Sequence, residues 1–238
     1  MAEIEIISHS SHRLIVMQEL ERLQADAEVM GLLLAGSVAR GDAAPSSDVD
    51  LCVLLRKGCS RSFEAETISG ILVERKYADL TSSIKRIKSN PMEVYAYLDG
   101  RILFDLECGL IRLTAFARKR LEGYRMPEEE RRAISHWLRS AAIKIAAAQE
   151  AGNDLKAAFV ATSTAWKVLE GIWAVNDKPM PPSGCVISHL KDLNFPTTSD
   201  PSWFMRLLQG ETPTRVTTTL ALINELVPRL SEPVTEPQ

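Results

Sequence analysis

The chain has 238 residues, of which 45% are hydrophobic and 25% charged, with a formal net charge of −3 and an isoelectric point near 5.9. This composition is typical of a globular protein with one large or two modest domains, and it excludes a disordered or fibrous chain. The slight acidic excess argues against a protein that grips long nucleic acids by overall charge, because such binding relies on clustered Lys and Arg. This composition does not exclude a local basic patch on the surface.

The cysteines and the N-terminal residues indicate in which cellular compartment the protein is expected. The four cysteines form no CxxC pair, so we expect buried, reduced thiols: Cys52, Cys59, Cys108 and Cys185. The N-terminus carries acidic residues where a signal peptide would be basic, and no apolar window reaches the length that spans a bilayer. We therefore expect a cytoplasmic protein with no membrane partner.

The first hundred residues predict a sheet with helices. Ser10 or Ser11 is expected to cap a helix that runs to near Met30 and covers the sheet with an apolar face of Leu14, Met17, Leu20 and Leu23. Three strands are predicted in "GLLLAGS", "DVDLCVLL" and "GILVERKY". A capped short helix then stops before Pro91, and the turn pair Asp99-Gly100 leads into a strand that ends near Asp105.

The pattern changes after Leu106. Alanine, leucine and charged residues at helical spacing replace the strand-like stretches, so the sequence predicts one domain over residues 1–106 and a helical domain over residues 107–238. Within the second domain "NDKPMPPSG" is predicted to be a loop, followed by helices in "CVISHLKDL", "PSWFMRLLQG" and "TPTRVTTTLALINELVPRL" and a polar tail. We expect Trp166 and Trp173, seven residues apart on one helical face, to pack in the core.

The stretch "GSVARGDAAPSSDVDL" carries the chemistry. In a strand, Asp48, Asp50 and Cys52 lie on one side, with Val49, Leu51 and Val53 on the other. Two carboxylates so close repel each other unless a divalent cation lies between them, and oxygen ligands suit magnesium. Gly36-Ser37 follows a strand and begins a helical turn, so backbone N–H groups and the Ser37 hydroxyl would face a triphosphate.

These residues carry a family resemblance. "LLLAGSVARGDAAPSSDVDLCVLL" resembles the signature of the nucleotidyltransferases of the DNA polymerase beta superfamily, in which Gly-Ser on a helical turn precedes a D-x-D strand. Within this superfamily the sequence most resembles the small bacterial members, which include the minimal and the kanamycin nucleotidyltransferase-like enzymes. The resemblance implies an α+β fold, with a mixed-sheet catalytic domain followed by an all-α bundle that completes the acceptor pocket or an oligomer interface. It also implies two Mg²⁺ ions and transfer of a nucleoside monophosphate, AMP from ATP, with release of pyrophosphate.

The family has a third carboxylate on a nearby strand, for which Glu74 is the first candidate and Asp79 the second. Glu74 would share a strand face with Leu72 and Lys76. The resemblance makes Asp48, Asp50 and Glu74 the metal-binding and catalytic residues, with Glu74 as third ligand or base and Gly36 and Ser37 holding the β- and γ-phosphates. The alternative for Glu74 is an exposed strand residue paired with a basic neighbour.

The acceptor and several alternatives stay open. The acceptor is expected to be a hydroxyl-bearing small molecule or a protein side chain rather than a nucleic acid, and a homodimer is allowed. Acids of the helical domain that could bind a cationic acceptor are Glu150, Asp154 and Glu170. A catalytically weak, antitoxin-like binding protein is a second hypothesis. A third is a HEPN-type ribonuclease, from the R-x4-H pattern of Arg131 and His136, although a solvated helical face explains that pattern more simply. Arg40 with Gly41 could shape its turn or touch phosphate, but a guanidinium at the end of a short helix usually caps that helix, so no catalytic role is assigned to it.

Overall fold

The computed structural model describes residues 5–196 and 202–231, which divide into two compact units. The sheet unit consists of Met1–Gly123 together with Pro181–Cys185, as far as these are described. The helical unit consists of Tyr124–Met180 and the described part of Val186–Gln238. The short segment Pro181–Cys185 thus leaves the helical unit in sequence and packs with the sheet unit in space.

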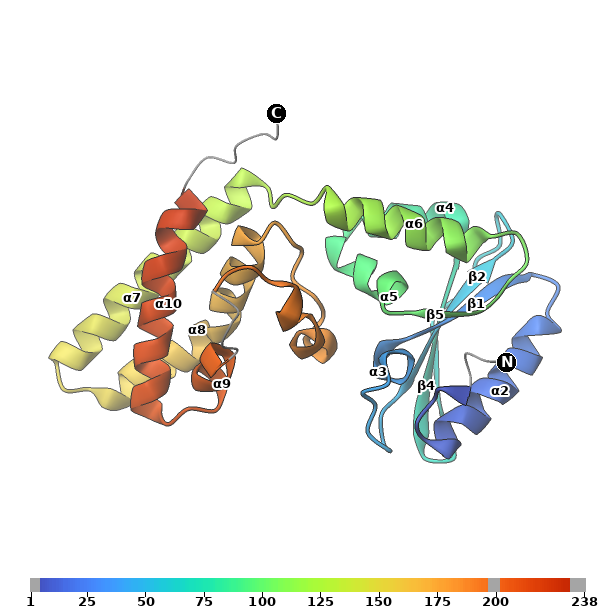
Figure 1. Cartoon of the computed structure of the whole chain (residues 1–238), viewed down its shortest axis with the longest axis horizontal. Coiled ribbons are helices and arrows are strands. Elements are labelled where there is room, and N and C mark those ends of the chain that lie inside the picture. Colours follow the sequence, from blue (N-terminus) through green and yellow to red (C-terminus); the bar gives the residue numbers. More distant parts are fainter. Residues whose placement is uncertain (1–4, 197–201, 232–238) are drawn as a thin grey trace. The chain divides into compact units, whose positions relative to one another are not determined.

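A five-stranded mixed sheet forms the centre of the sheet unit (Figure 1). The strand order is β3-β4-β2-β1-β5, and the strands are β1 (Val29–Ala35), β2 (Val49–Leu55), β3 (Glu64–Ile68), β4 (Ile71–Asp79) and β5 (Arg101–Asp105). β2 and β4 run parallel, whereas the other neighbouring pairs are antiparallel. The mixed sheet and the helices confirm the predicted α+β class.

Helices cover both faces of this sheet (Figure 1). α2 (Ser10–Gln24) covers one face, where Ile15, Val16 and Leu23 pack against strand residues. α4 (Leu80–Ser89), α5 (Val94–Leu98) and α6 (Gly109–Glu122) lie on the other. The short α3 (Gly36–Arg40) follows β1 directly, and a 3₁₀ turn (Pro91–Glu93) precedes α5.

The helix α6 belongs to the sheet unit. Its residues Leu110 and Leu113 are buried in one cluster with Leu33 of β1 and Leu54 of β2. The division between the units accordingly falls after Gly123, beyond the change in sequence pattern at residue 107. The sequence pattern indicates where the last strand ends. The boundary between the two units depends instead on which core each helix packs against.

Three predictions about α2 are wrong. The helix starts at Ser10 with His9 as its N-cap and no side-chain cap bond, and it ends at Gln24 rather than near Met30. Leu14 and Met17, expected on the buried face, are 56% and 44% exposed. The buried face instead includes two polar residues, His12 and Glu19, each with a partner on another element: Nε2 of His12 lies next to the carbonyl of Ser47, and Glu19 accepts from Arg75.

The edge strand β3 was not predicted. It forms a hairpin with β4 through Ser69 and Gly70, whose φ angles of 52° and 83° are those of a tight two-residue turn. The side chains of its sequence EAETI are almost all exposed, so the strand lacks the alternation of apolar and polar residues that would have predicted it. The strands predicted at β1, β2, β4 and β5 are confirmed, as are the helical turn after β1 and the short helix before Pro91.

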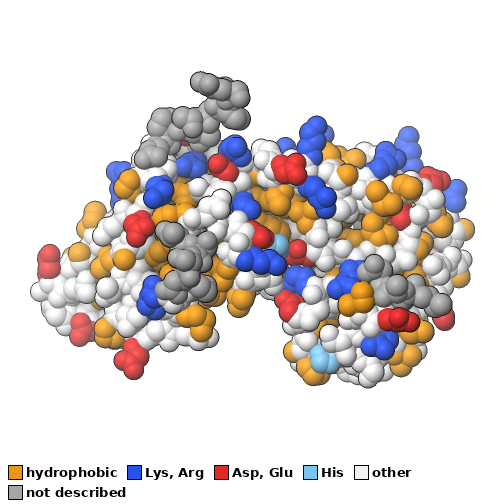
Figure 2. Space-filling view, viewed as in Figure 1, with side chains coloured by type: hydrophobic (Ala, Val, Ile, Leu, Met, Phe, Trp, Pro, Cys, Tyr) orange, Lys and Arg blue, Asp and Glu red, His pale blue; other side chains and the backbone are white. Residues whose placement is uncertain are grey.

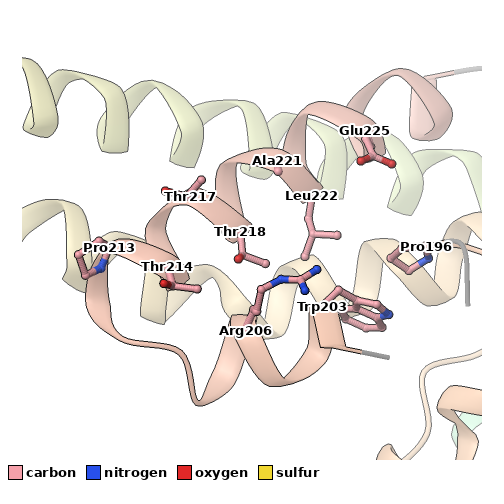
Figure 3. A pocket seen from close by; sticks show the side chains of 10 residues that line it. All are labelled: Pro196, Trp203, Arg206, Pro213, Thr214, Thr217, Thr218, Ala221, Leu222 and Glu225. Atoms are coloured by element: carbon pink, nitrogen blue, oxygen red, sulfur yellow. The ribbon is translucent and has the colours of Figure 1, made fainter. Parts of the chain in front are cut away.

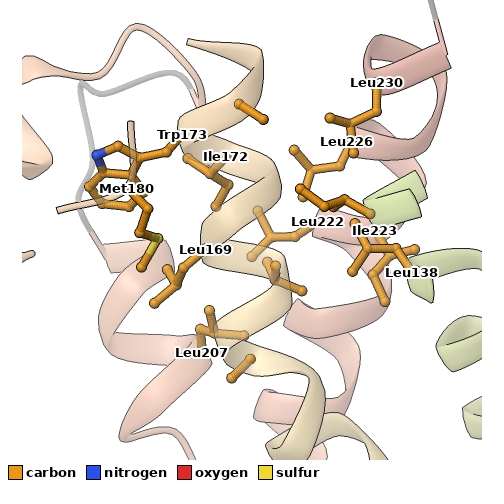
Figure 4. Close-up of a cluster of buried hydrophobic side chains, with 14 of the residues drawn as sticks. Leu138, Leu169, Ile172, Trp173, Met180, Leu207, Leu222, Ile223, Leu226 and Leu230 are labelled. Atoms are coloured by element: carbon orange, nitrogen blue, oxygen red, sulfur yellow. The ribbon is translucent and has the colours of Figure 1, made fainter. Parts of the chain in front are cut away.

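The helical unit consists of four α-helices and one 3₁₀ helix among its described residues. These are α7 (Glu128–Glu150), α8 (Asp154–Val175), a 3₁₀ helix (Ile187–Asp192), α9 (Ser202–Leu208) and α10 (Thr212–Ser231). α7, α8 and α10 enclose a leucine-rich core that includes Leu138, Ile172 and Leu226 (Figure 4). The helix expected in "CVISHLKDL" is 3₁₀ rather than α-helical, and the tail from residue 232 lies outside the described residues.

Several smaller predictions have mixed outcomes. Trp173 is fully buried in this core, but Trp166 is 43% exposed, so only one of the two is a core residue. The four cysteines are free, as expected, yet Cys108 is exposed and only Cys185 is fully buried. Hydrophobic side chains also reach the surface (Figure 2). None of the described helices is long and apolar enough to cross a membrane.

Candidate active site

Three carboxylates meet at one end of the parallel strand pair. Asp48 directly precedes β2, Asp50 lies within β2 and Glu74 within β4. The parallel register places Asp50 opposite Glu74. One oxygen from each carboxylate lies within 4.8 Å of the others, and we call these three residues the carboxylate trio. The structure therefore brings together the three acids that the sequence analysis selected.

Strand alternation explains why these side chains face the same way. On β2 the side chains of Val49, Leu51 and Val53 are buried under α2, while Asp50 and Cys52 point to the opposite face. On β4, Val73 and Arg75 are buried, whereas Glu74 and Lys76 are more accessible. Both predictions of the faces are confirmed, and the apolar face anchors each strand while the polar face serves the site.

The Gly36-Ser37 turn lies directly against Asp50 of the trio. Gly36 has a φ of +68°, and a Cβ atom at this position would lie 2.2 Å from Oδ2 of Asp50. A glycine is needed both for the left-handed backbone and for this close approach. The turn is closed by the carbonyl of Ser37, which accepts hydrogen bonds from the N–H groups of Gly41 and Asp42. The backbone of α3 thus lies against the carboxylate of Asp50.

His12 of α2 and the N-cap residue His9 hold the loop that leads to Asp48. His12 is fully buried, and its Nε2 lies 2.8 Å from the carbonyl oxygen of Ser47. Nε2 of His9 lies 2.9 Å from the carbonyl oxygen of Ala43. The helix on the opposite face of the sheet therefore fixes the backbone next to the first carboxylate, a contact that the apolar pattern of the helix did not indicate.

The electrostatics at Asp50 favour a bound cation. Burial raises the pKa of Asp50 above its ordinary value, the charge of Lys76 opposes this, and the neighbouring Asp48 adds to it. Nζ of Lys76 lies 3.7 Å from Oδ1 of Asp50. The raised pKa means that the ionised carboxylate is incompletely compensated by the protein itself, so an additional positive charge at this point is favourable.

Asp48 and Asp50 of the trio line a cavity of about 320 Å³ within the sheet unit, and Glu74 lies next to them without lining it. Basic side chains on its wall are Arg40, Lys76 and Arg86, and acidic side chains are Asp48, Asp50, Glu93 and Asp99. Gly36 and Ser37 line it on the α3 side, and Pro182, Gly184 and Cys185 supply a further wall. The cavity therefore combines backbone donors, cations and carboxylates within one concave site.

Residues 16–122 match the family model of the nucleotidyltransferase domain. The sheet unit contains a nucleotidyltransferase domain. Nucleotidyl transfer is the activity of this domain, and a nucleotide is its substrate. The match covers the whole sheet and α6, and it ends at the residue that ends this helix.

Comparison with solved structures gives a nucleotidyltransferase-like protein from Exiguobacterium sibiricum 255-15. The two chains are 16% identical, with a TM-score of 0.42, and the alignment covers 91% of this chain and 73% of the other. Among the curated proteins none matches this chain.

Several residues of the nucleotidyltransferase cavity were not selected from the sequence. Lys76 could have been, because it follows Glu74 on the same strand face. Arg86 and Asp99 carry no local signal, and the segment Pro182–Cys185 is separated from the rest by two long helices. Arg40 lines the cavity, and its Nη2 donates to the carbonyl of Gly184 at 2.9 Å. This bond fixes the distant segment to α3, a role other than capping.

The remaining candidates lie away from the trio or have other partners. Asp79, the second choice for the third acid, caps α4 by accepting hydrogen bonds from the N–H groups of Ser82 and Gly58. Arg131 is buried and donates to the carbonyls of Ala174 and Arg229, whereas His136 is exposed. The acids Glu150, Asp154 and Glu170 belong to the helical unit and do not line the cavity of the domain.

The helical unit has a cavity of its own, of about 640 Å³ (Figure 3). It lies between α9 and α10 and is lined mainly by threonine and apolar side chains, with Arg206 and Glu225 as its charged residues. Thr214, Thr217 and Thr218 of α10 line it (Figure 3). It contains none of the residues that the sequence analysis selected for chemistry.

Replacing Gly36 with alanine should damage the site and the fold together. We expect the free energy of unfolding to fall by about 2 to 3 kcal/mol, because the left-handed backbone strains a β-carbon and the contact with Asp50 must be relieved by movement. Urea unfolding of the variant measures this loss. Gly41→Ala is the matched control: its φ is +87°, but no atom lies within 4 Å of the added carbon. Equal losses in both variants would contradict the claimed contact with Asp50.

Proposed function

We propose that the protein transfers a nucleoside monophosphate, AMP from ATP, to a hydroxyl group of a small molecule or protein in a magnesium-dependent reaction. The observation that carries the proposal is the carboxylate trio of a nucleotidyltransferase domain, two of whose acids, Asp48 and Asp50, line one cavity together with the Gly36-Ser37 turn. Carboxylates and backbone donors on the same wall match a ligand that combines metal ions with phosphates.

The donor set fits a divalent cation. Carboxylate oxygens are the ligands that Mg²⁺ prefers, and three of them converge here at distances that one or two ions can bridge. Asp48, Asp50 and Glu74 would hold the metal. When bound, it would neutralise charge that accumulates on the phosphates during transfer. The raised pKa of Asp50 supports this assignment, because the cavity leaves its charge incompletely balanced.

The phosphates would lie against α3 and the basic side chains. The N–H groups of Gly36 and Ser37 and the Ser37 hydroxyl would hold the β- and γ-phosphates. Lys76 and Arg86 line the same cavity and supply positive charge to the triphosphate. Phosphate binding of this kind orients the α-phosphate towards the trio.

The reaction follows from this placement. The acceptor hydroxyl oxygen attacks the α-phosphorus, the bond from this phosphorus to the bridging oxygen of the β-phosphate breaks, and pyrophosphate leaves with that electron pair. A carboxylate oxygen of Glu74 accepts the proton of the attacking hydroxyl. Positioning and charge neutralisation supply most of the rate acceleration.

The charges on the cavity wall bear on the acceptor. Glu93 and Asp99 place acidic groups on its wall, which suits an acceptor that carries hydroxyl or amino groups. A hydroxylated small molecule or a single protein side chain meets this description better than a long polynucleotide.

The direct test is incubation of the full chain with Mg²⁺ and each α-labelled nucleoside triphosphate, together with hydroxyl-bearing small molecules and with cell extract. Label from ATP that moves to an acceptor, with release of pyrophosphate, is the expected result. Nucleotide binding without any transfer would contradict the proposed catalysis and leave a nucleotide-binding protein.

Glu74→Gln should separate transfer from nucleotide binding. We expect the transfer rate to fall by about a hundredfold, because an amide accepts no proton and is a poorer metal ligand. The dissociation constant for the nucleotide should change only a few-fold, since Asp48 and Asp50 remain. Single-turnover transfer and equilibrium nucleotide binding measure the two effects. Glu21→Gln, an exposed acid on α2, is the control, and an unchanged transfer rate in Glu74→Gln would remove Glu74 from the site.

A further inference from the structure

His12 is a buried polar residue that acts through a single hydrogen bond. It is fully buried on α2, and its Nε2 lies 2.8 Å from the carbonyl oxygen of Ser47. A carbonyl oxygen only accepts hydrogen bonds, so Nε2 carries the ring proton and donates. Nδ1 is buried and has no partner within the described ranges. The polar function of this side chain is therefore confined to its contact with Ser47.

The carbonyl that His12 holds belongs to the peptide unit that joins Ser47 to Asp48. The atoms from one Cα to the next lie in one plane, so a fixed carbonyl oxygen restricts where the nitrogen and Cα of Asp48 can lie. His12 is not among the residues that line the cavity at Asp48 and Asp50. It thus reaches the first carboxylate through the backbone alone, from the α2 side of the sheet.

Asp48 needs such support more than the other two acids of the trio. Asp50 is held in the sheet by pairing with Ala35 and Glu74. Glu74 is held in the same way, by Asp50 on one side and Ala65 on the other. Asp48 precedes β2, is exposed, and its carboxylate has no hydrogen bond or ion pair with any residue that the structure describes. Its position therefore depends on the backbone that leads to it.

The loop that His12 holds is closed on itself. The N–H of Ser47 donates to the carbonyl of Ala44 at 2.9 Å, and the N–H of Ala44 donates to the Ser47 hydroxyl, also at 2.9 Å. His9 holds the same loop at Ala43, and its ring packs edge-on against His12 with the ring centroids 5.4 Å apart. The two histidines make the same kind of contact, but only His12 holds the peptide unit next to the trio.

We propose that His12 is a positioning residue that sets the affinity of the carboxylate trio for a divalent cation, by fixing the peptide unit before Asp48. The inference rests on the proposed function, in which the trio binds a metal. Groups that orient a metal ligand without touching the metal typically contribute a factor of about 10 to 100 in metal affinity. Without the hydrogen bond, binding of the ion has to order the backbone at Asp48 as well, which costs conformational entropy.

Titration of the full chain with Mn²⁺ in the absence of nucleotide, followed by electron paramagnetic resonance of the free ion, tests the proposal. Mn²⁺ takes the same oxygen ligands as Mg²⁺. His12→Phe keeps a ring and removes the donor, so it should raise the dissociation constant for Mn²⁺ by about ten- to a hundredfold. The number of ions bound per chain should not change. His9→Phe is the matched control and should leave the dissociation constant close to that of the unchanged protein.

A conservative pair of variants at the same position provides a second test. The amide nitrogen of glutamine reaches about as far from the backbone as Nε2 of histidine, whereas that of asparagine reaches only as far as Nδ1. His12→Gln should therefore bind Mn²⁺ nearly as tightly as the unchanged protein, and His12→Asn should bind it as weakly as His12→Phe. This comparison decides the question even if His12→Phe does not fold.

The outcomes separate the role of His12 from the metal site itself. Equal dissociation constants for the unchanged protein and for His12→Asn would overturn the positioning role and leave the metal site in place. Fewer ions bound per chain at an unchanged dissociation constant would indicate partial unfolding and would overturn it too, as would an equal loss of affinity in His9→Phe. Failure of the unchanged protein to bind Mn²⁺ would instead overturn the proposed metal site, and the role of His12 with it.

Discussion

Replacing both Asp48 and Asp50 with asparagine is expected to lower the rate of nucleotidyl transfer by at least about a thousandfold. The amides keep the size of the side chains but lose the two negative charges that would hold the metal. Single-turnover transfer of an α-labelled nucleotide measures the effect. Glu129→Gln, an exposed acid at the start of α7, is the control and should transfer at the rate of the unchanged protein.

The same double variant should remain fully folded. The pKa of Asp50 is raised in the folded state, mainly by burial, so its charged form opposes folding at neutral pH. Removing that charge should leave the thermal midpoint unchanged or raise it. A midpoint well below that of the unchanged protein would mean that the lost transfer reflects unfolding, and it would contradict a specific role for the two acids.

Replacing Arg75 with methionine should lower the free energy of unfolding by about 3 to 5 kcal/mol. The guanidinium is buried in the sheet unit and makes a two-pronged contact with Glu19 of α2, from Nε at 2.6 Å and from Nη2 at 2.7 Å. Nη2 also donates to Glu66 of β3 at 2.5 Å. The substitution leaves the buried carboxylate of Glu19 without its main partner and removes the ion pairs that link α2 and β3 to β4.

Urea unfolding at neutral pH measures this loss, with Arg61→Met as the control. Arg61 also contacts two acids, Asp26 and Glu28, but its side chain is 26% exposed, so about 1 kcal/mol or less is expected. Similar losses in the two variants would contradict the importance of burial. Arg75→Met/Glu19→Leu should recover much of the loss, because it removes the unpaired charge as well.

The pair also predicts how stability depends on pH. Burial alone would raise the pKa of Glu19, but hydrogen bonds from Arg75 and Arg22 outweigh it and hold the pKa below the ordinary value of 4.5. A group with a lowered folded-state pKa stabilises the fold above its unfolded pKa. That contribution is lost as the pH falls below 4.5 through the folded-state pKa, and the variant with both substitutions should lack this part of the acid dependence.

The elements with local signals were predictable from the sequence. β1, β2 and the turn at Gly36 follow from apolar runs next to a glycine. The strand β3 could not be found this way, because its five residues are nearly all exposed, although Ser69-Gly70 before an apolar run is a hairpin signal. The orientation of α2 also failed, since the burial of His12 and Glu19 depends on partners far away in sequence.

For the candidate site too, the residues with a local sequence signal were predictable and the others were not. Asp48 and Asp50 follow from strand alternation, and Glu74 follows from alternation plus the expectation of a third acid on a neighbouring strand. Arg86 and the segment Pro182–Cys185 form part of the cavity wall only because of tertiary packing. No pattern of residue spacing within a single sequence predicts such contacts. Chemistry concentrated on paired strands is therefore predictable, whereas the surfaces that shape the substrate are not.

The parallel register of β2 and β4 limits where the length of this chain can change. Asp50 lies opposite Glu74, and the next pair joins Leu51 to Arg75. Deleting or inserting one residue between Ile71 and Glu74 would move a carboxylate out of the site and turn a neighbour of the opposite face towards it. The loop between β2 and β3 is not subject to this constraint on length near Ser62 and Phe63, which are exposed. Insertions such as a peptide tag or a reporter loop belong there.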